Sequence, residues 1–524
     1  MNRNRYRLVY NTTLGMQVPV AEIARQRTKR ASQLTGPALA LLLVAFPALA
    51  QPLPVPCGGG ACGVNPNPTA FVGSGAANYA ISGTQGIVTQ TTNRAILNWQ
   101  SFNIHKGYSM EFIQPGAGAA TLNRIWQSDA SVIAGSLKAN GQIYLYNQNG
   151  ILFKDGAQVN VGSLIASPLD IDDKWFLNGI PSNLDAGGVA AFAATGGATG
   201  GLVRVDAGAT LKTENGGRVM LLAENVENHG VIETPEGQTI LAAGSKVYLA
   251  VADDPSLRGF LVEVDNGGTV TNTGRILAER GNVSVTGLAV NQSGRITAST
   301  SANLNGSIRL MARDTVSGVA KDTSNPTVTV PVATRTGTLV LGANSTTEVL
   351  PDASDRKTLT DAQVFNRSRI EGVGKTIHVQ GGAVVRATSG EIDLAAQAGP
   401  VFQNAGDAKV NGVRVQVDHG ALLDTAGVAD VTIPVARNYI QVELRGSQLA
   451  DSPLQRNTFL NKSKVWIDAE KGTKLADVSA DIAKLERTVA EKSAVGGNIT
   501  LRSEGDLVLQ RGATLDVSGG SIAY

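Results

Sequence analysis

The chain has 524 residues, including 60 glycines, and only 5% of its residues are aromatic and 17% charged. Seven of the 45 basic residues and one of the 43 acidic residues lie in positions 1–50, so the rest carries 38 basic and 42 acidic residues, a net charge of about −4. This balance excludes a basic surface for nucleic acid. The length is too great for one ordinary compact core but suits a repeat protein.

The first segment, residues 1–50, is predicted to be a signal peptide of about twice the usual length. A basic flank precedes the apolar run Leu34–Ala50, which ends in two small residues, Ala48 and Ala50. This pattern predicts cleavage between Ala50 and Gln51. The run contains two prolines and falls short of the ~20 residues that span a bilayer, so a signal is favoured over a membrane anchor.

The residues before the apolar run, MNRNRYRLVYNTTLGMQVPVAE, are more than a plain signal needs. Through Tyr6–Asn11 and Val18–Glu22 they resemble the extended signal region of very large exported proteins of Gram-negative bacteria. We therefore expect the chain to enter the periplasm.

Residues 51–92 are predicted to form an N-terminal cap that contains both cysteines, Cys57 and Cys62. In an oxidising periplasm a disulfide between them is plausible, and the intervening glycines could bring them within reach. Free or intermolecular thiols remain the alternative. No histidine lies near enough to suggest a zinc site.

From about residue 93 the sequence becomes a series of short apolar runs that end at Gly or Asn, which is typical of strands joined by tight turns. One pattern, V-x-N/Q-x-G-x-I, begins at Val226 and recurs after 44 and then 20 residues, at Val270 and Val290. A spacing near 20, once doubled, predicts a solenoid. We expect an all-β, right-handed parallel β-helix over 93–320 that continues as a rod over 321–450, with about 18 coils and a length of about 90 Å.

The region 451–495 is predicted to be a helical insertion. Its apolar residues are spaced by three and four, which predicts a helix of about twenty residues. These residues are Leu475, Val478, Ile482, Leu485 and Val489. The strand pattern returns over 496–524, where we expect a β-helix that is truncated rather than capped.

Six motifs follow one another between residues 93 and 167: Ala95–Ile104, Leu122–Ile125, Ile133–Leu137, Ala139–Leu145, Asn147–Phe153 and Gly156–Val161. Their order and spacing resemble the N-terminal secretion domain of the filamentous haemagglutinin family, the exported partners of two-partner secretion systems. The resemblance covers the signal and residues 65–320, and more loosely the later repeats.

This resemblance implies how the chain is exported and where it acts. The chain would cross the inner membrane by the general secretory machinery and lose its signal to signal peptidase. A dedicated outer-membrane β-barrel transporter would then recognise the unfolded chain, which would fold outside, coil by coil. The product would be a secreted or cell-surface rod of the adhesin kind, whose host or bacterial receptor the sequence does not reveal.

The family usually carries Asn-Pro-Asn-Gly-Ile where this chain has Asn147, Gln148, Asn149, Gly150 and Ile151. The two Asn and the Gly suit a tight corner with positive φ. The resemblance implies that this turn is read by the transporter. A turn with a purely structural role is an equally open alternative.

Two other functions, a toxin or cytolysin and a polysaccharide-active enzyme, are the alternatives to an adhesin. Contact-dependent toxins and cytolysins share this secretion domain, and a downstream effector domain would distinguish them. A β-helix enzyme acting on polysaccharide would need a pair of carboxylates. Asp170, Asp172 and Asp173 form a cluster, but a solvated acidic turn is the favoured interpretation of it. The four scattered histidines and a partial phosphate-loop motif at Gly374–Thr376 predict no catalytic residue, metal or cofactor site.

Overall fold

The computed structural model describes residues 6–11, 16–21, 52–58, 62, 70–180, 189–195, 201–251, 258–322, 325–399, 402–403, 412–443, 462–474 and 477–524. The chain divides into two units, Met1–Ala50 and Gln51–Tyr524. In the first unit, β1 (Tyr6–Asn11) pairs antiparallel with β2 (Met16–Ala21). Within these described ranges no helix is long and apolar enough to cross a membrane.

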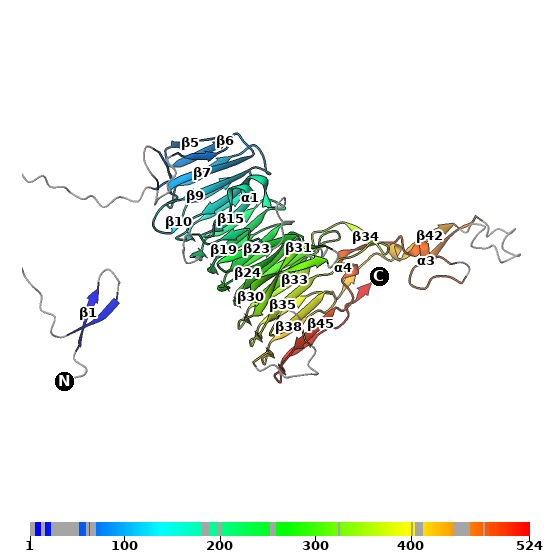
Figure 1. Ribbon diagram of the computed structural model, residues 1–524. Coiled ribbons are helices and arrows are strands. Elements are labelled where there is room, and N and C mark those ends of the chain that lie inside the picture. The colour runs from blue at the N-terminus through cyan, green and yellow to red at the C-terminus, as the bar shows by residue number, and fades with distance from the viewer. Residues whose placement is uncertain are drawn as a thin grey trace, which may run out of the picture. The chain divides into compact units, whose positions relative to one another are not determined.

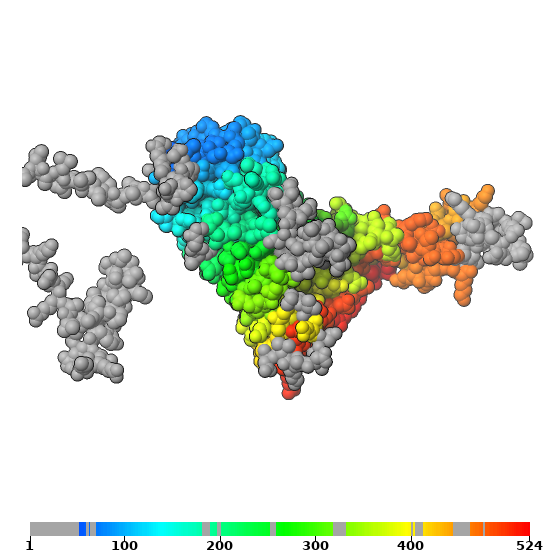
Figure 2. All heavy atoms as spheres, viewed as in Figure 1, coloured from blue at the N-terminus to red at the C-terminus, as the bar shows by residue number. Residues whose placement is uncertain are grey.

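The second unit is built on three long sheets in which successive coils lie side by side, in chain order from the blue N-terminal strands to the yellow and red C-terminal ones (Figure 1, Figure 2). Each full coil gives one strand to each sheet, and strands of neighbouring coils pair in parallel. The predicted parallel β-helix is confirmed.

The first sheet has ten strands. They are β10 (Ser131–Ile133), β13 (Ile151–Phe153), β17 (Leu202–Val205), β20 (Asn225–Asn228), β25 (Thr269–Asn272), β28 (Ala289–Gln292), β32 (Thr338–Leu341), β36 (Thr376–Val379), β39 (Arg414–Val417) and β46 (Asp506–Leu509).

The second sheet has thirteen strands. They are β5 (Ala77–Ser82), β6 (Gln85–Gln90), β8 (Ser109–Ile113), β11 (Ser136–Ala139), β14 (Gln158–Val161), β18 (Thr210–Thr213), β21 (Val231–Glu233), β26 (Arg275–Ala278), β29 (Arg295–Thr300), β33 (Thr346–Pro351), β37 (Val384–Ala387), β40 (Leu422–Asp424) and β47 (Thr514–Asp516).

The third sheet has fourteen strands. They are β3 (Val55–Pro56), β4 (Val72–Ser74), β7 (Arg94–Ser101), β9 (Ala120–Ile125), β12 (Gln142–Tyr146), β15 (Ser163–Ser167), β19 (Arg218–Ala223), β22 (Gln238–Ala243), β27 (Asn282–Gly287), β30 (Ser307–Asp322), β31 (Asn325–Thr336), β35 (Arg369–Gly374), β38 (Glu391–Ala396) and β45 (Asn498–Ser503).

The core runs along the inside of the rod as stacked rows of apolar side chains. Val226, Val270 and Val290 pair in register on successive coils and are at most 1% exposed. Ile276 pairs in the same way with Ile232 and Ile296. The echoes seen in the sequence are therefore neighbours in space, as the repeat pattern predicts.

The 44-residue interval between Val226 and Val270 is one coil, not two. The extra residues form β23 (Lys246–Val251) and β24 (Phe260–Asp265), an antiparallel pair outside the rod. The described parts of 168–201, 313–336, 352–368 and 427–496 form similar excursions. The expected 18 coils are accordingly too many, because each full coil gives one strand to each sheet and, among the described residues, none of the three sheets has more than fourteen strands.

The outer face of the fourteen-stranded sheet carries a second apolar cluster. Here Tyr144, Met220 and Ile240 point away from the rod axis and are covered by α1 (Asp173–Asn178) and by β16 (Phe192–Ala193), which pairs with β23. Figure 1 shows α1 and β23 beside β15 and β19. Excursions thus bury a sheet face that water would otherwise meet.

At the N-terminal end, β3 and β4 pair antiparallel with β7, and β5 pairs antiparallel with β6. Phe71, which directly precedes β4, and Tyr79 of β5 lie edge-on to Trp99, with ring centroids 4.9 and 5.1 Å from that of Trp99. Trp99 is fully buried. This packing covers the first parallel coil, whose open edge would otherwise invite pairing with another chain.

The short helical insertion expected near the C-terminus is present as two helices of 4 residues each, but the prediction of one helix of about twenty residues is wrong. Between residues 477 and 492 the chain forms α3 (Ser479–Ile482), β44 (Glu486–Thr488) and α4 (Val489–Lys492), and Leu475 lies outside the described residues. β44 is held in strand form by antiparallel pairing with β34 (Thr358–Thr360). Thr488 then starts α4 by a capping box with Glu491.

The apolar residues of that predicted helix also pack in two places rather than one. Val478 and Ile482 pack against β42 (Tyr439–Glu443) and β43 (Lys464–Asp468), which pair antiparallel after η2 (Val435–Asn438). Val489 packs elsewhere, against Leu359 of β34. The last short pair joins β41 (Val431–Thr432) to β48 (Ile522–Ala523).

Candidate functional site

The Asn147–Ile151 segment is a tight corner between β12 and β13, and Asn147 organises it. Its side chain is fully buried. The Nδ2 group donates to the carbonyl oxygen of Asp129 and to Oγ of Ser131, both at 3.0 Å, while Oδ1 accepts from the backbone N–H of Asn149 at 3.0 Å. One amide therefore closes its own turn and fastens it to the corner of the preceding coil.

Gly150 occupies a position that only glycine suits. Its φ is 103°, and its N–H donates to the carbonyl of Asn147 at 2.8 Å. A Cβ added there would lie 2.5 Å from the carbonyl oxygen of Leu202 on the next coil. Ile151 follows, fully buried and paired in register with Ser131 and Val203. The left-handed backbone and the close approach both explain the glycine.

The corner is linked to the two coils before it through two side-chain amides, of which Gln127 is buried and Asn149 is exposed. Asn149 donates from Nδ2 to the carbonyl of Gln127 at 2.8 Å, and Gln127 accepts from the N–H of Phe102 at 2.9 Å. No role was predicted for Gln127 from the sequence, although an amide residue one coil before the turn residues is a signal that could have indicated such a link. Gln148, by contrast, is exposed.

The other residues predicted to have roles fall into two groups. The signal cleavage residues Ala48, Ala50 and Gln51 lie outside the described residues. In the structure Cys57 and Cys62 are joined by a disulfide with their Cα atoms 5.7 Å apart, and both are buried. The N–H of Cys57 donates to the carbonyl of Asn98 at 3.0 Å, so this loop is tied to the first coil.

The three aspartates considered for catalysis are all engaged in local structure. Asp172 caps α1 by accepting from the N–H of Lys174 at 2.8 Å. Asp170 and Asp173 form ion pairs with Arg124 at 3.0 and 2.5 Å. Burial raises the pKa of Asp170, and the charge of Arg124 opposes that rise. The cluster holds α1 against the sheet, and its carboxylates do not face one another across a cleft.

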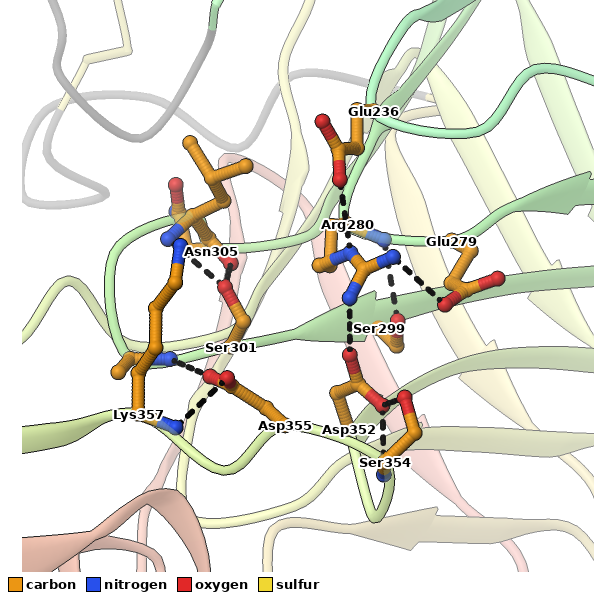
Figure 3. A network of polar contacts seen from close by, with 12 residues as sticks. Glu236, Glu279, Arg280, Ser299, Ser301, Asn305, Asp352, Ser354, Asp355 and Lys357 are labelled. Carbon is orange, nitrogen blue, oxygen red and sulfur yellow. Dashed lines mark hydrogen bonds and ion pairs between the residues drawn. The ribbon is translucent and has the colours of Figure 1, made fainter. Parts of the chain in front are cut away.

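A larger network of charges surrounds Arg280 (Figure 3). Its guanidinium forms ion pairs with Glu236, Glu279 and Asp352 at 3.2, 3.0 and 3.0 Å. Asp352 also accepts from the hydroxyl of Ser354 at 2.6 Å. These contacts fasten the excursion after β33 to two coils of the rod. Among the described residues, no group of His, Cys, Asp and Glu could hold a metal ion.

The parallel β-helix and the signal-like N-terminal segment define an exported β-helical protein. A family model described as TPS secretion domain matches residues 63–386, and one described as Extended Signal Peptide of Type V secretion system matches residues 1–51. The chain belongs to the TPS secretion domain family, the exported partners of two-partner secretion systems. It is exported through the periplasm to the cell surface or the medium, and its domain implies a dedicated outer-membrane transporter.

The similar proteins found by comparison each match only part of this chain. Two heme/hemopexin-binding proteins of Haemophilus influenzae are 38% identical over 98 and 85 residues, which is 19% and 16% of this chain but 11% and 9% of theirs. The match thus spans about a tenth of those relatives. The crystal structure of the HMW1 secretion domain from Haemophilus influenzae has a TM-score of 0.51 and 22% identity, covering 69% of this chain and 84% of that chain. At that identity the likeness shows the fold alone.

Proposed function

We propose that this chain is a secreted adhesin of a two-partner secretion system, whose transporter reads the Asn147–Ile151 segment before the β-helix closes. The observation that carries the proposal is the burial of Asn147. Its amide is enclosed by the coils in the folded rod. A transporter can therefore contact it only in the unfolded chain.

An extended chain offers the transporter both backbone and side chains. Strand segments can add to a sheet edge in the transporter's periplasmic part, with main-chain hydrogen bonds giving affinity and alternate side chains giving specificity. Free Asn147 and Asn149 amides would add hydrogen bonds there. Those same groups later find partners in Asp129, Ser131 and Gln127 of the growing rod.

Folding outside the cell supports one-way export. Each coil pairs with its immediate neighbours in three sheets, so an emerging end can fold before the rest of the chain appears. Each new coil buries its apolar row against the last one, which makes backward movement unfavourable. The finished rod then presents its outer surfaces for adhesion to other cells.

We further propose that the protein is not an enzyme. A polysaccharide hydrolase needs two carboxyl groups that flank one sugar bond. Asp170 and Asp173 are both paired with Arg124, and Asp172 caps a helix. No catalytic residue or cofactor is assigned.

The test is export of Asn147→Ala/Asn149→Ala with the cognate transporter present, followed by immunoblots of medium and periplasm. We expect the double variant to remain in the periplasm, whereas Gln148→Pro, which restores the usual family residue, should reach the medium at the wild-type level. Refolding of both purified variants, followed by circular dichroism, separates recognition from folding. Export of the double variant at the wild-type level would contradict the assignment of Asn147 and Asn149 as transporter-recognition residues. Efficient export without any such transporter would contradict the whole proposal.

A further inference from the structure

A groove of about 540 Å³ lies where the corners of three successive coils stack. Gln100 comes from the end of β7, Trp126 and Asp129 from the corner after β9, and Gln148 and Asn149 from the corner after β12. The volume lies within the roughly 300–1,000 Å³ of small-molecule sites. The groove is therefore large enough for a small ligand that spans three coils.

The frame around the groove is fixed by contacts that leave the side chains of Gln100, Asp129 and Gln148 unused, whereas Asn149 takes part through its bond from Nδ2 to the carbonyl of Gln127 at 2.8 Å. Gln127 donates to the carbonyl of Asp129 at 3.0 Å, and Asn147 fixes the next corner from inside the rod. Trp126 is half-buried, and its Nε1 donates to Oδ1 of Asn98 at 3.2 Å. These bonds set the positions of the corners before any ligand arrives, which lowers the cost of ordering a binding site.

The exposed groups of the groove have one chemistry in common. Gln100, Gln148 and Asn149 offer primary amides, and Asp129 offers a carboxylate. Within the described part of the chain, the side chains of Gln100, Asp129 and Gln148 make no hydrogen bond or ion pair. Amides both donate and accept, so they match hydroxyl groups, which do the same. Trp126 adds an apolar, polarisable ring for C–H groups.

Gln148 brings to this groove an exposed amide that its turn does not need. The family usually has proline there, and proline would bring no hydrogen-bonding side chain. Gln148 occupies the second position of a turn closed by the N–H of Gly150 and the carbonyl of Asn147 at 2.8 Å. Proline is favoured at that position. The turn therefore does not require glutamine, and its exposed amide is free to serve another purpose.

We propose that this groove binds a neutral pyranose sugar, with Trp126 against the ring and the three amides and Asp129 on its hydroxyls. The inference rests on the proposed adhesive function and names the class of ligand. The carboxylate of Asp129 accepts from sugar hydroxyls and repels anionic sugars. Neutral hexoses and N-acetylhexosamines are therefore preferred over sialic and uronic acids.

The test uses the purified exported chain and an array of immobilised neutral, sialylated and uronic-acid-containing glycans, followed by calorimetric titration of the neutral sugars that bind. Gln148→Pro combined with Gln100→Ala should weaken binding at least tenfold. Gln441→Ala, which removes an exposed glutamine on β42, should leave it unchanged. Addition of sugar should also change tryptophan fluorescence, and Trp126→Phe should abolish that change.

Three results would overturn this inference: no neutral sugar bound, binding indifferent to the Gln148 and Gln100 changes, or preference for anionic glycans or proteins. The amount of each variant in the medium is measured separately. That measurement distinguishes a failure of sugar binding in the groove from a failure of the proposed export and adhesion. A chain that is exported and adhesive but binds no sugar in this groove would contradict only the further inference.

Discussion

Asn228 and Asn272 lie on neighbouring coils and are joined inside the rod, where Nδ2 of Asn228 donates to Oδ1 of Asn272 at 2.7 Å. Asn272 in turn donates to Oε1 of Gln292 at 2.6 Å. All three side chains are at most 2% exposed. The Asn or Gln of the repeated V-x-N/Q pattern thus forms a buried ladder of side-chain amides. Each amide in it is hydrogen-bonded to the equivalent amide of a neighbouring coil.

Asn272→Ala should destabilise the rod by roughly 3 kcal/mol, because it leaves both Nδ2 of Asn228 and the side-chain Oε1 of Gln292 without the bonds that they make to Asn272. Urea unfolding followed by circular dichroism measures the loss. Asn291→Ala, at the half-exposed position directly before Gln292, should change stability by less than about 0.5 kcal/mol. Equal effects of the two changes would contradict the ladder.

Gly150→Ala should destabilise the protein more than Gly216→Ala. Both glycines have positive φ, 103° and 79°, so each change costs about 1–2 kcal/mol from the backbone conformation. Only at Gly150 does the added Cβ also meet a backbone oxygen, that of Leu202, at 2.5 Å, whereas nothing lies within 4 Å at Gly216. Thermal unfolding measures the stability of the two variants. An equal loss of stability would show that the next coil shifts to make room for the added methyl group.

Stability should fall between pH 10 and pH 12 through Tyr79. Burial raises its pKa from 10.0 to about 12. The phenol therefore ionises more readily in the unfolded chain. Its stabilising contribution is complete below pH 10 and disappears as the pH rises through about 12. Other tyrosines and lysines titrate in the same range, so the comparison is with Tyr79→Phe, which also removes the hydrogen bond to the carbonyl of Pro54.

Urea unfolding of Tyr79→Phe and of the wild type across this pH range measures the difference between them. The variant should start less stable and lose less stability as the pH rises. Parallel curves would mean that Tyr79 does not titrate in this way.

The secreted chain should begin at Gln51, since the apolar run ends with Ala48 and Ala50 in the small-residue positions of a cleavage site. Mass spectrometry of protein from the medium gives the N-terminus directly. Ala50→Leu should slow processing and leave a longer species attached to the inner membrane. Secreted protein that retains residues 1–50 would rule out the signal interpretation.

The sequence determined the class of fold through patterns that depend only on near neighbours. Alternating apolar residues and Gly or Asn corners specify strands and turns locally. The echo of Val226 at Val270 and Val290 fixed which residues stack, because a parallel β-helix repeats the same environment in each coil. The turn at Asn147–Ile151 was predictable for the same reason, since a left-handed corner restricts its residue types.

Contacts between residues distant in sequence were decided only by the tertiary structure. The spacing of Val478, Ile482 and Val489 suited one helix, yet pairing of β44 with β34, more than a hundred residues away, divides them between two small cores. Arg124 likewise meets Asp170 and Asp173 only because the first excursion folds back over the sheet. Local spacing sets propensity, but burial against a particular partner has the larger free energy and selects the final conformation.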